Sequence, residues 1–181
     1  KLTEESVVFR NAYVTQPVCT PARSTVMTGL WPHQNGCTAN NIPLPDDVPT
    51  FNQIVDDPGY RAGYFGKWHL GDEIFKQHGF DSWEAIEDNY IKYYSTERDR
   101  NARSAYHHFL EQAGYTPDPN RRIFTRDFAA RLPIEHCKPA FLEKKTIDFL
   151  KQNRRNPFML FVNFLEPHMP FYGPLNDLHD P

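Results

Sequence analysis

The sequence predicts an α/β fold with a mostly parallel sheet, because a helix-like segment is followed by a strand-like segment twice along the chain. The apolar run 158–165 is typical of a strand buried on both faces of a parallel sheet. The stretch 140–152 before it is amphipathic, with Phe, Leu and Ile at helical spacing. Earlier, a helix-like segment ending at Val55 precedes a short strand at 61–65. Alternation of this kind indicates packed α/β layers.

The other elements are predicted from β-branched runs, caps and helix breakers. Residues 7–13 combine β-branched and aromatic side chains and predict a short strand. Residues 22–30 predict a helix that stops near Gly29. Thr50 is a suitable N-cap for the helix that runs to Val55.

The stretch 87–131 is polar and charged, and it gives few structural signals. A helix is predicted only at 102–113, and the rest has the character of loops. We interpret 87–131 as a loop-rich insertion in a domain that otherwise occupies residues 1–181.

Composition excludes several classes of protein. The chain has 181 residues and a net charge of −3, which gives no general case for nucleic-acid binding. No apolar run reaches the roughly 18–20 residues of a membrane span. The chain opens with Lys1 and ends at Pro181, both of which look like cuts in a longer protein. Cys37 and Cys137 are expected to be ordinary structural residues, with a disulfide between them as the alternative.

The first chemically notable cluster is Cys-Thr-Pro-Ala-Arg-Ser at 19–24, just ahead of the predicted helix. A helix N-terminus offers unpaired N–H groups and partial positive charge, which suit an anion and make a thiol reactive. Arg23 lies about one helical turn from Cys19 and offers a forked cationic donor to an oxyanion. The alternative is a structural Cys19 beside a surface Arg23.

The second cluster is Gly-Lys-Trp-His-Leu-Gly at 66–71. Lys67 and His69 alternate along an extended segment, so both are expected to face the same side. A cation beside an imidazole suits charge neutralisation combined with proton transfer. The alternative is a solvated Lys67 and a core His69.

The third cluster is Glu-Pro-His-Met-Pro-Phe at 166–171, which follows the predicted strand 158–165. In open α/β sheets, ligands bind at the carboxyl ends of the strands. His168 stands close to two prolines that restrict its loop, as a catalytic group requires. The alternative is an ordinary loop histidine.

Together the three clusters resemble the type I sulfatases, which use formylglycine and belong to the alkaline-phosphatase-like superfamily. The segment from Cys19 to Ser24, followed by Thr28-Gly29, resembles the first sulfatase signature, and 63–71 resembles the second. Pro167-His168-Met-Pro-Phe171 resembles the histidine loop of the same enzymes. The resemblance implies an α/β/α sandwich, incomplete in this chain, and an expected hydrolase of sulfate esters, with sulfated carbohydrate as the first substrate class.

The resemblance also implies roles for single residues. A maturation enzyme would oxidise Cys19 to formylglycine (3-oxoalanine), whose hydrate attacks sulfur. Arg23 would hold this group, and Lys67 would bind the sulfate oxygens. His69 would accept a proton during sulfate release, and His168 would bind sulfate or protonate the leaving oxygen.

The resemblance further implies one Ca²⁺ ion, bound in part by the modified Cys19. The other metal ligands are expected outside this chain, so the 181-residue piece by itself is expected to be inactive. We interpret Asp46-Asp47 and Asp56-Asp57 as solvated pairs. A periplasmic, secreted or lysosomal location is favoured by the family alone.

Two alternative functions stay open at this stage. One is a phosphonate monoester hydrolase or phosphodiesterase of the same superfamily. The other is a non-catalytic, sulfatase-like protein that binds sulfated glycans. Fold alone does not separate these functions, whereas the site residues do.

Overall fold

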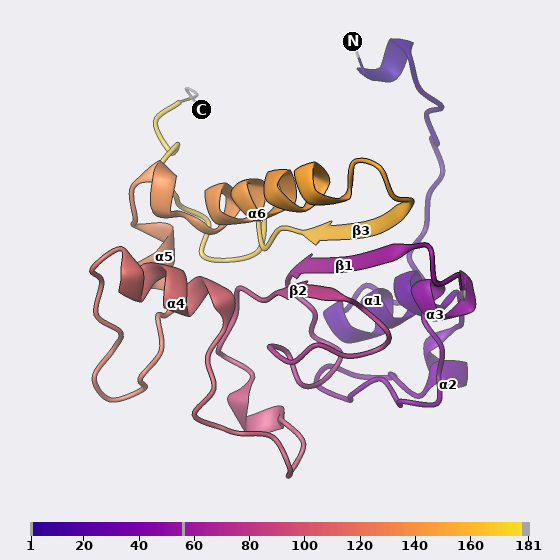
Figure 1. Cartoon of the computed structure of the whole chain (residues 1–181), viewed down its shortest axis with the longest axis horizontal. Helices are drawn as coiled ribbons and strands as arrows, with labels where there is room; N and C mark the ends of the chain where they lie inside the picture. The colour runs from indigo at the N-terminus through magenta and orange to yellow at the C-terminus, as the bar shows by residue number, and fades with distance from the viewer. Residues whose placement is uncertain (1, 56, 179–181) are drawn as a thin grey trace.

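The computed structural model describes residues 2–55 and 57–178 and confirms the α/β class (Figure 1). Asp56, one half of a predicted solvated pair, lies outside the described residues. The strands are β1 (Arg61–Gly66), β2 (Ser82–Glu84) and β3 (Phe158–Asn163). The α-helices are α1 (Cys19–Thr28), α2 (Pro32–Asn35), α3 (Phe51–Val55), α4 (Ala105–Gln112), α5 (Arg126–Ala130) and α6 (Lys138–Asn153). Short 3-10 turns are η1 (Leu2–Glu4), η2 (Ile91–Tyr93) and η3 (Ile134–His136).

The three strands form one parallel sheet in the order β2-β1-β3. Gly63 of β1 is in register with Ser82 of β2 and Leu160 of β3. The strand β1 is buried from its second residue onward, whereas β3 is half-buried and begins with an exposed Phe158. The prediction that 158–165 is buried on both faces was therefore wrong, because in the described part of the chain this strand lies at the sheet edge.

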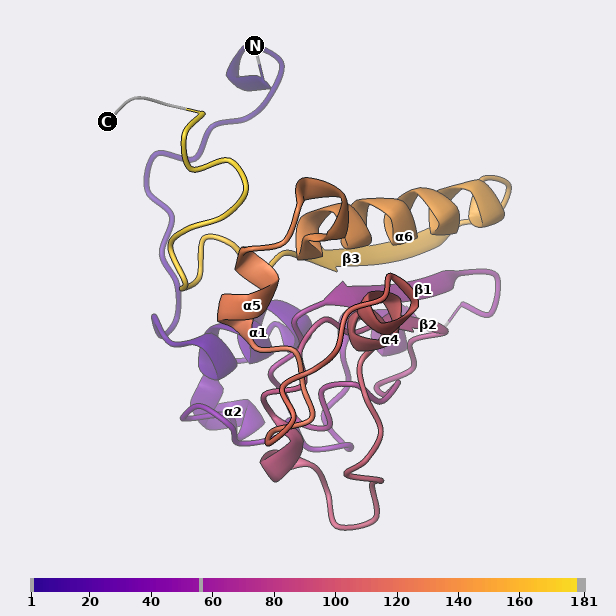
Figure 2. The ribbon, with the colours of Figure 1, turned by 90° about the vertical axis from the view of Figure 1, so that its left-hand side faces the viewer.

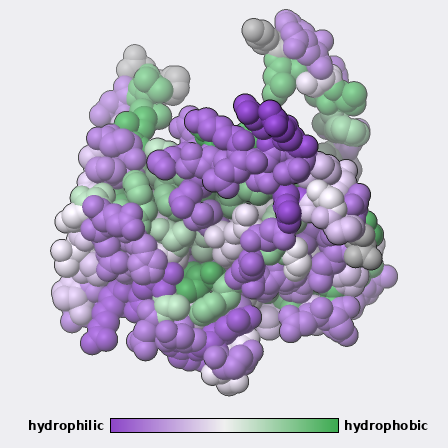
Figure 3. Space-filling view, in the orientation of Figure 1, coloured by the Kyte–Doolittle hydropathy of each residue, from purple (hydrophilic) through white to green (hydrophobic). Residues whose placement is uncertain are grey.

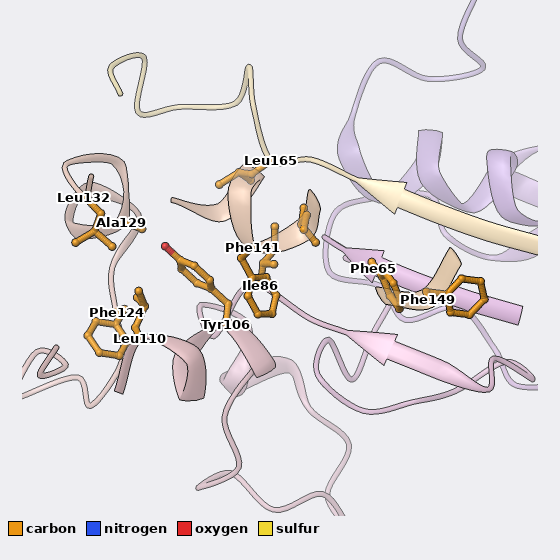
Figure 4. Close-up of a cluster of buried hydrophobic side chains, with 11 residues drawn as sticks. Phe65, Ile86, Tyr106, Leu110, Phe124, Ala129, Leu132, Phe141, Phe149 and Leu165 are labelled. Carbon is orange, nitrogen blue, oxygen red and sulfur yellow. The ribbon is translucent and has the colours of Figure 1, made fainter. Parts of the chain in front are cut away.

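Side chains of β1 alternate between two hydrophobic cores, one on each face of the sheet. Phe65 packs edge-on against Phe149 of α6, with ring centroids 5.6 Å apart, in a core that continues to α4 and α5 (Figure 4). Tyr64 belongs to the opposite core, with Met27 of α1 and Trp68. Helix α6 thus covers one face and α1 the other, as the two ribbon views agree (Figures 1 and 2). This is the layered α/β/α arrangement.

Helix α3 begins directly after its predicted N-cap, Thr50, and ends at Val55 as predicted, whereas the other predicted helices begin near their predicted residues but not at them. Helix α1 starts at Cys19, three residues before its predicted start, because Pro21 sits in the first turn, where a missing N–H costs nothing. It ends as predicted at Gly29, which has a left-handed φ of 72°. Helix α4 is shorter than predicted, because the Ser104 side chain caps it by accepting from the His107 N–H.

The predicted strand at 7–13 was wrong. The segment forms no strand, and Val7 and Tyr13 are 80% and 93% exposed. Figure 3 shows it as a separate arm that carries hydrophobic residues. A β-strand needs a neighbour for its backbone hydrogen bonds, and none of the described strands lies against this arm.

The alternative of a disulfide between Cys37 and Cys137 is excluded, because both thiols are free. Cys37 is fully buried in the core on the α1 side. The thiol of Cys137 donates to the Ile134 carbonyl over 2.8 Å. Both cysteines are therefore structural, as expected.

Candidate active site

Helix α1 places Cys19 at its first residue, where the thiol is half-buried. The next residue, Thr20, ties this end of the helix to the second motif. Its side-chain hydroxyl donates to the His69 carbonyl over 2.8 Å, and its N–H donates to the Asn40 side chain over 3.0 Å. The first two sequence motifs, 49 residues apart at this contact, therefore meet at the start of α1.

Arg23 reaches from α1 to the end of β1. Its Nη1 donates to the Lys67 carbonyl oxygen over 2.6 Å, and the Tyr64 hydroxyl donates to the same oxygen over 2.7 Å. These two bonds fix the backbone of Lys67. No described residue accepts a hydrogen bond from the Nε or Nη2 of Arg23, so part of the guanidinium stays available to an anion.

The backbone leaves β1 at Gly66, where only glycine fits. Its φ is +108°, and a Cβ at this position would lie 1.9 Å from the Asn163 carbonyl oxygen of β3. The buried carboxylate of Glu73 then holds the next turn, accepting from the N–H groups of Trp68 (2.8 Å) and His69 (2.6 Å). Burial raises the pKa of Glu73 to about 7.

Lys67 is only 2% exposed, and its Nζ has no hydrogen-bond acceptor among the described residues. Burial lowers its pKa, and the nearby Cys19 acts in the opposite direction. Its Nζ lies 5.9 Å from the centre of the Tyr90 ring. A desolvated ammonium with free donors is suited to bind an anion.

His69 is also buried, and its imidazole packs on Tyr90 with ring centroids 4.3 Å apart. Its Nε2 lies 3.0 Å from the Asn41 side-chain oxygen, whereas its Nδ1 has no partner in the described part of the chain. Burial lowers the pKa of His69 to about 3, and the cations of Lys67 and Arg23 add to this effect. The imidazole is therefore neutral near pH 7 and can accept a proton.

A second layer of charged residues lies behind Tyr90. The buried Glu87 carboxylate binds Arg126 and Lys138 at once. Burial alone would raise the pKa of Glu87, but the two cations outweigh this effect and lower it to about 2. Arg126 also donates to the Tyr90 hydroxyl over 3.0 Å.

Sequence reasoning missed this second layer, and it also missed Asn41 and Glu73. Glu87 and Arg126 are 39 residues apart, and Glu87 and Lys138 are 51 apart. No motif or spacing connects them in the sequence. The Thr125 N-cap, which starts α5 and places Arg126 in its first turn, was the one local signal that could have been used.

The structure does not bring His168 into contact with Cys19, Lys67 or His69 among the described residues. It is half-buried in the loop after β3, and its Nδ1 donates to the Met169 carbonyl over 3.0 Å. Its loop lines a largely apolar cavity of about 790 Å³, which Arg126 also borders. Through its bond to Tyr90, Arg126 thus lies between this cavity and the Lys67–His69 site.

The described residues do not offer Ca²⁺ a binding site of their own. They contain no group of three or more His, Cys, Asp and Glu side chains that could hold a metal. The titratable residues that the structure brings to the start of α1 are Arg23, Lys67 and His69, which are cationic or neutral. Asp46, Asp47 and Asp57 are all exposed. These residues do not fit the oxygen-rich shell that Ca²⁺ needs.

Comparison with known proteins gives a consistent result. The family model described as Sulfatase matches residues 1–176. A Delta 4,5-hexuronate-2-O-sulfatase of Bacteroides thetaiotaomicron is 36% identical over 99% of this chain and 34% of its own length. An uncharacterized sulfatase, YidJ, of Escherichia coli K12 is 28% identical over 98% of this chain and 34% of its own. The chain therefore spans about a third of the length of the curated relatives it matches.

Among solved structures, a phosphonate monoester hydrolase from Silicibacter pomeroyi superposes with a TM-score of 0.61, at 18% identity, over 90% of this chain and 35% of its own. At this identity the likeness concerns the fold, which is the expected alkaline-phosphatase-like one. None of the described helices combines the length and the apolar character that a membrane span requires.

Proposed function

Because the chain belongs to the sulfatase family, we propose that this protein hydrolyses sulfate esters with a nucleophile made from Cys19. The observation that carries the proposal is the meeting of Cys19, Arg23, Lys67 and His69 at the start of α1. Within this group, Arg23 and Lys67 can bind an anion, and the neutral imidazole of His69 can take up a proton. Hydrolysis of a sulfate ester requires both functions.

Formylglycine at Cys19 would supply a hydrated aldehyde, in which one hydroxyl attacks sulfur and the other allows the sulfate to be expelled. Lys67 binds the sulfate oxygens, since its buried ammonium has no internal acceptor in the described chain. Arg23 orients Lys67 through the bond to its carbonyl, and the remaining N–H groups of Arg23 are available to hold the nucleophile. His69 accepts a proton at Nδ1, the atom without a partner among the described residues.

His168 has a more distant role in the proposal. Its Nδ1–H donates to the Met169 carbonyl, so Nε2 would bind sulfate or protonate the leaving oxygen when it carries a second ring proton. The cavity that its loop lines, beside Arg126, has the size to take the alcohol portion of a substrate.

We further propose sulfated carbohydrate as the substrate class, which the relative named as a hexuronate-2-O-sulfatase supports. Formylglycine requires a maturation enzyme as a partner. One Ca²⁺ ion belongs to the proposal for the whole protein, but no step above depends on it, because the described residues do not form its site. A location outside the cytosol is supported by relatives named as extracellular sulfatases.

The test is to express the whole protein with a maturation enzyme and to analyse the peptide that contains Cys19. Formylglycine lowers the peptide mass by about 18 Da, because oxidation replaces the thiol by an aldehyde oxygen. The same preparation should hydrolyse an aryl sulfate faster than an aryl phosphonate ester. The opposite preference would favour the phosphonate hydrolase alternative, and an unmodified thiol with no turnover would favour the non-catalytic one.

A further inference from the structure

Tyr90 lies between two residues of the second motif, Lys67 and His69, and the charged group that contains Arg126. The His69 imidazole packs on its ring at 4.3 Å between centroids. The Lys67 Nζ and the guanidinium carbon of Arg126 lie 5.9 and 6.0 Å from the same ring centre. One half-buried aromatic ring therefore contacts both the proposed proton acceptor and the proposed sulfate-binding cation.

The position of Tyr90 is fixed from behind by a buried chain of charges. Arg126 Nη2 donates to the Tyr90 hydroxyl over 3.0 Å, and Arg126 Nε donates to Glu87 over 2.7 Å. The other Glu87 oxygen accepts from Lys138, at the start of α6. The Glu87 side chain is fully buried and each of its oxygens is occupied, so Arg126 has little freedom to move.

We propose that Tyr90 is a positioning residue for the reaction, and that the Glu87–Arg126–Lys138 group exists to hold it against His69 and Lys67. The inference rests on the proposed sulfate ester hydrolysis. It assigns a task to the charged stretch 87–131, which supplies Glu87, Tyr90 and Arg126. The stretch forms one wall of the active site.

The chemistry of the contact supports a functional role. A smaller apolar residue in place of Tyr90 would leave one side of His69 open to water and would offer no π-face to the Lys67 ammonium. The ring also keeps water from the imidazole on its own side, while the Asn41 amide engages the Nε2 atom. Two flexible groups, a lysine and a histidine, thereby keep one arrangement before the substrate arrives.

Removal of the ring should change the protonation of His69. The charged groups that act on this imidazole are Lys67, Arg23, Arg126 and Glu87, and the buried Glu73 holds its backbone N–H. Entry of water beside these groups weakens the burial that keeps His69 neutral. The pKa of His69 should then rise toward its usual 6.5, and the acid limb of kcat should move to higher pH.

The experiment compares three variants of the whole, formylglycine-containing protein with an aryl sulfate as substrate. Tyr90→Leu removes the ring, and Tyr90→Phe removes only the hydroxyl. Tyr93→Leu is the matched control, because Tyr93 lies three residues away in the same segment and is exposed at the surface. Formylglycine content and the melting temperature are measured for each variant, so that rates refer to folded, matured enzyme.

We expect Tyr90→Leu to lower kcat at least about tenfold, with KM within about threefold, and to raise the pH midpoint of the acid limb. Tyr90→Phe should keep kcat within about threefold and leave the limb in place, and Tyr93→Leu should behave as wild type. If the wild-type enzyme is active and Tyr90→Leu has the same kcat and the same pH profile as Tyr93→Leu, the positioning role alone is overturned. A matured wild-type protein without sulfatase activity overturns the proposed function, and the positioning role with it.

Discussion

The Nε2 atom of His69 lies 3.0 Å from the side-chain oxygen of Asn41. A carboxamide oxygen can only accept, so the imidazole proton sits on Nε2 and the lone pair on Nδ1. The Asn41 N–H in turn donates to the Thr20 hydroxyl over 3.2 Å, beside the start of α1. Asn41 therefore selects the tautomer of His69 and links it to the helix that carries Cys19.

Replacement of Asn41 by glycine should lower kcat about tenfold, equivalent to about 1.4 kcal/mol of transition-state stabilisation, because the imidazole loses its tautomer preference. Asn41 has a φ of 66°, a conformation that glycine adopts without strain, so Asn41→Gly removes the amide alone. Steady-state kinetics on an aryl sulfate provides the measurement. The control is Asn101→Gly in an exposed turn. Equal kcat values for the two variants would contradict this role.

The activity should extend to lower pH than the ordinary titration of histidine allows. The pKa of His69 falls from 6.5 to about 3 through burial and neighbouring cations, so the imidazole stays an acceptor until the pH approaches 3. We expect no acid limb of kcat near pH 6.5 in the wild-type enzyme. A profile of kcat between pH 4 and 8 tests this, and a midpoint near 6.5 would show that His69 is open to water.

The same depressed pKa makes stability depend on pH. As the pH falls, His69 becomes protonated in the unfolded chain before it does in the folded protein. The stability that comes from its neutral, buried state is therefore present above pH 6.5 and is lost as the pH falls toward 3. The loss approaches about 1.4 kcal/mol for each pH unit. Urea unfolding at pH 7 and pH 5 should show a smaller difference for His69→Gln than for wild type. An unchanged difference would contradict the buried, neutral state of His69.

The elements that could be predicted are those with local signals. Helix α6 has an amphipathic period, α3 has Thr50 before it, and α1 ends at a left-handed glycine, so each is set by residues close in sequence. The segment 7–13 has strand composition but no strand beside it. Strand composition alone does not form a strand, since its backbone bonds must come from elsewhere in the chain.

The residues of the candidate site also fall into those that local spacing could predict and those that it could not. Cys19 and Arg23 share a helical turn, and Lys67 and His69 share one motif, so spacing could predict each pair. Tyr90 and the charged residues behind it come from separate loops and helices, and only the tertiary fold brings them to the site. The expected extended conformation at 67–69 was also wrong, because His69 has a φ of 59° and turns toward Tyr90.

Lys67 should stabilise the transition state of the reaction, although its buried charge lowers the stability of the folded protein. Its buried ammonium lacks an internal hydrogen-bond acceptor in the described chain, so Lys67→Met removes a desolvated charge at similar volume. We expect kcat to fall at least about 100-fold, while the melting temperature stays the same or rises. Kinetics and thermal unfolding are compared with those of Lys92→Met, where the lysine is exposed. A marked loss of stability in Lys67→Met would mean that Lys67 is a structural residue.

The buried Glu87 should contribute far more to stability than an ion pair nearer the surface. Glu87→Gln keeps the shape of the side chain but leaves the buried Lys138 and the half-buried Arg126 without a counter-charge. The free energy of unfolding should therefore fall by about 3 kcal/mol or more. The control is Glu84→Gln, which breaks the partly exposed pair with Lys145 and should cost less than about 1 kcal/mol. Urea unfolding of both variants gives the comparison. Similar losses would mean that water reaches Glu87, and that the group behind Tyr90 is too loose to hold its ring in place.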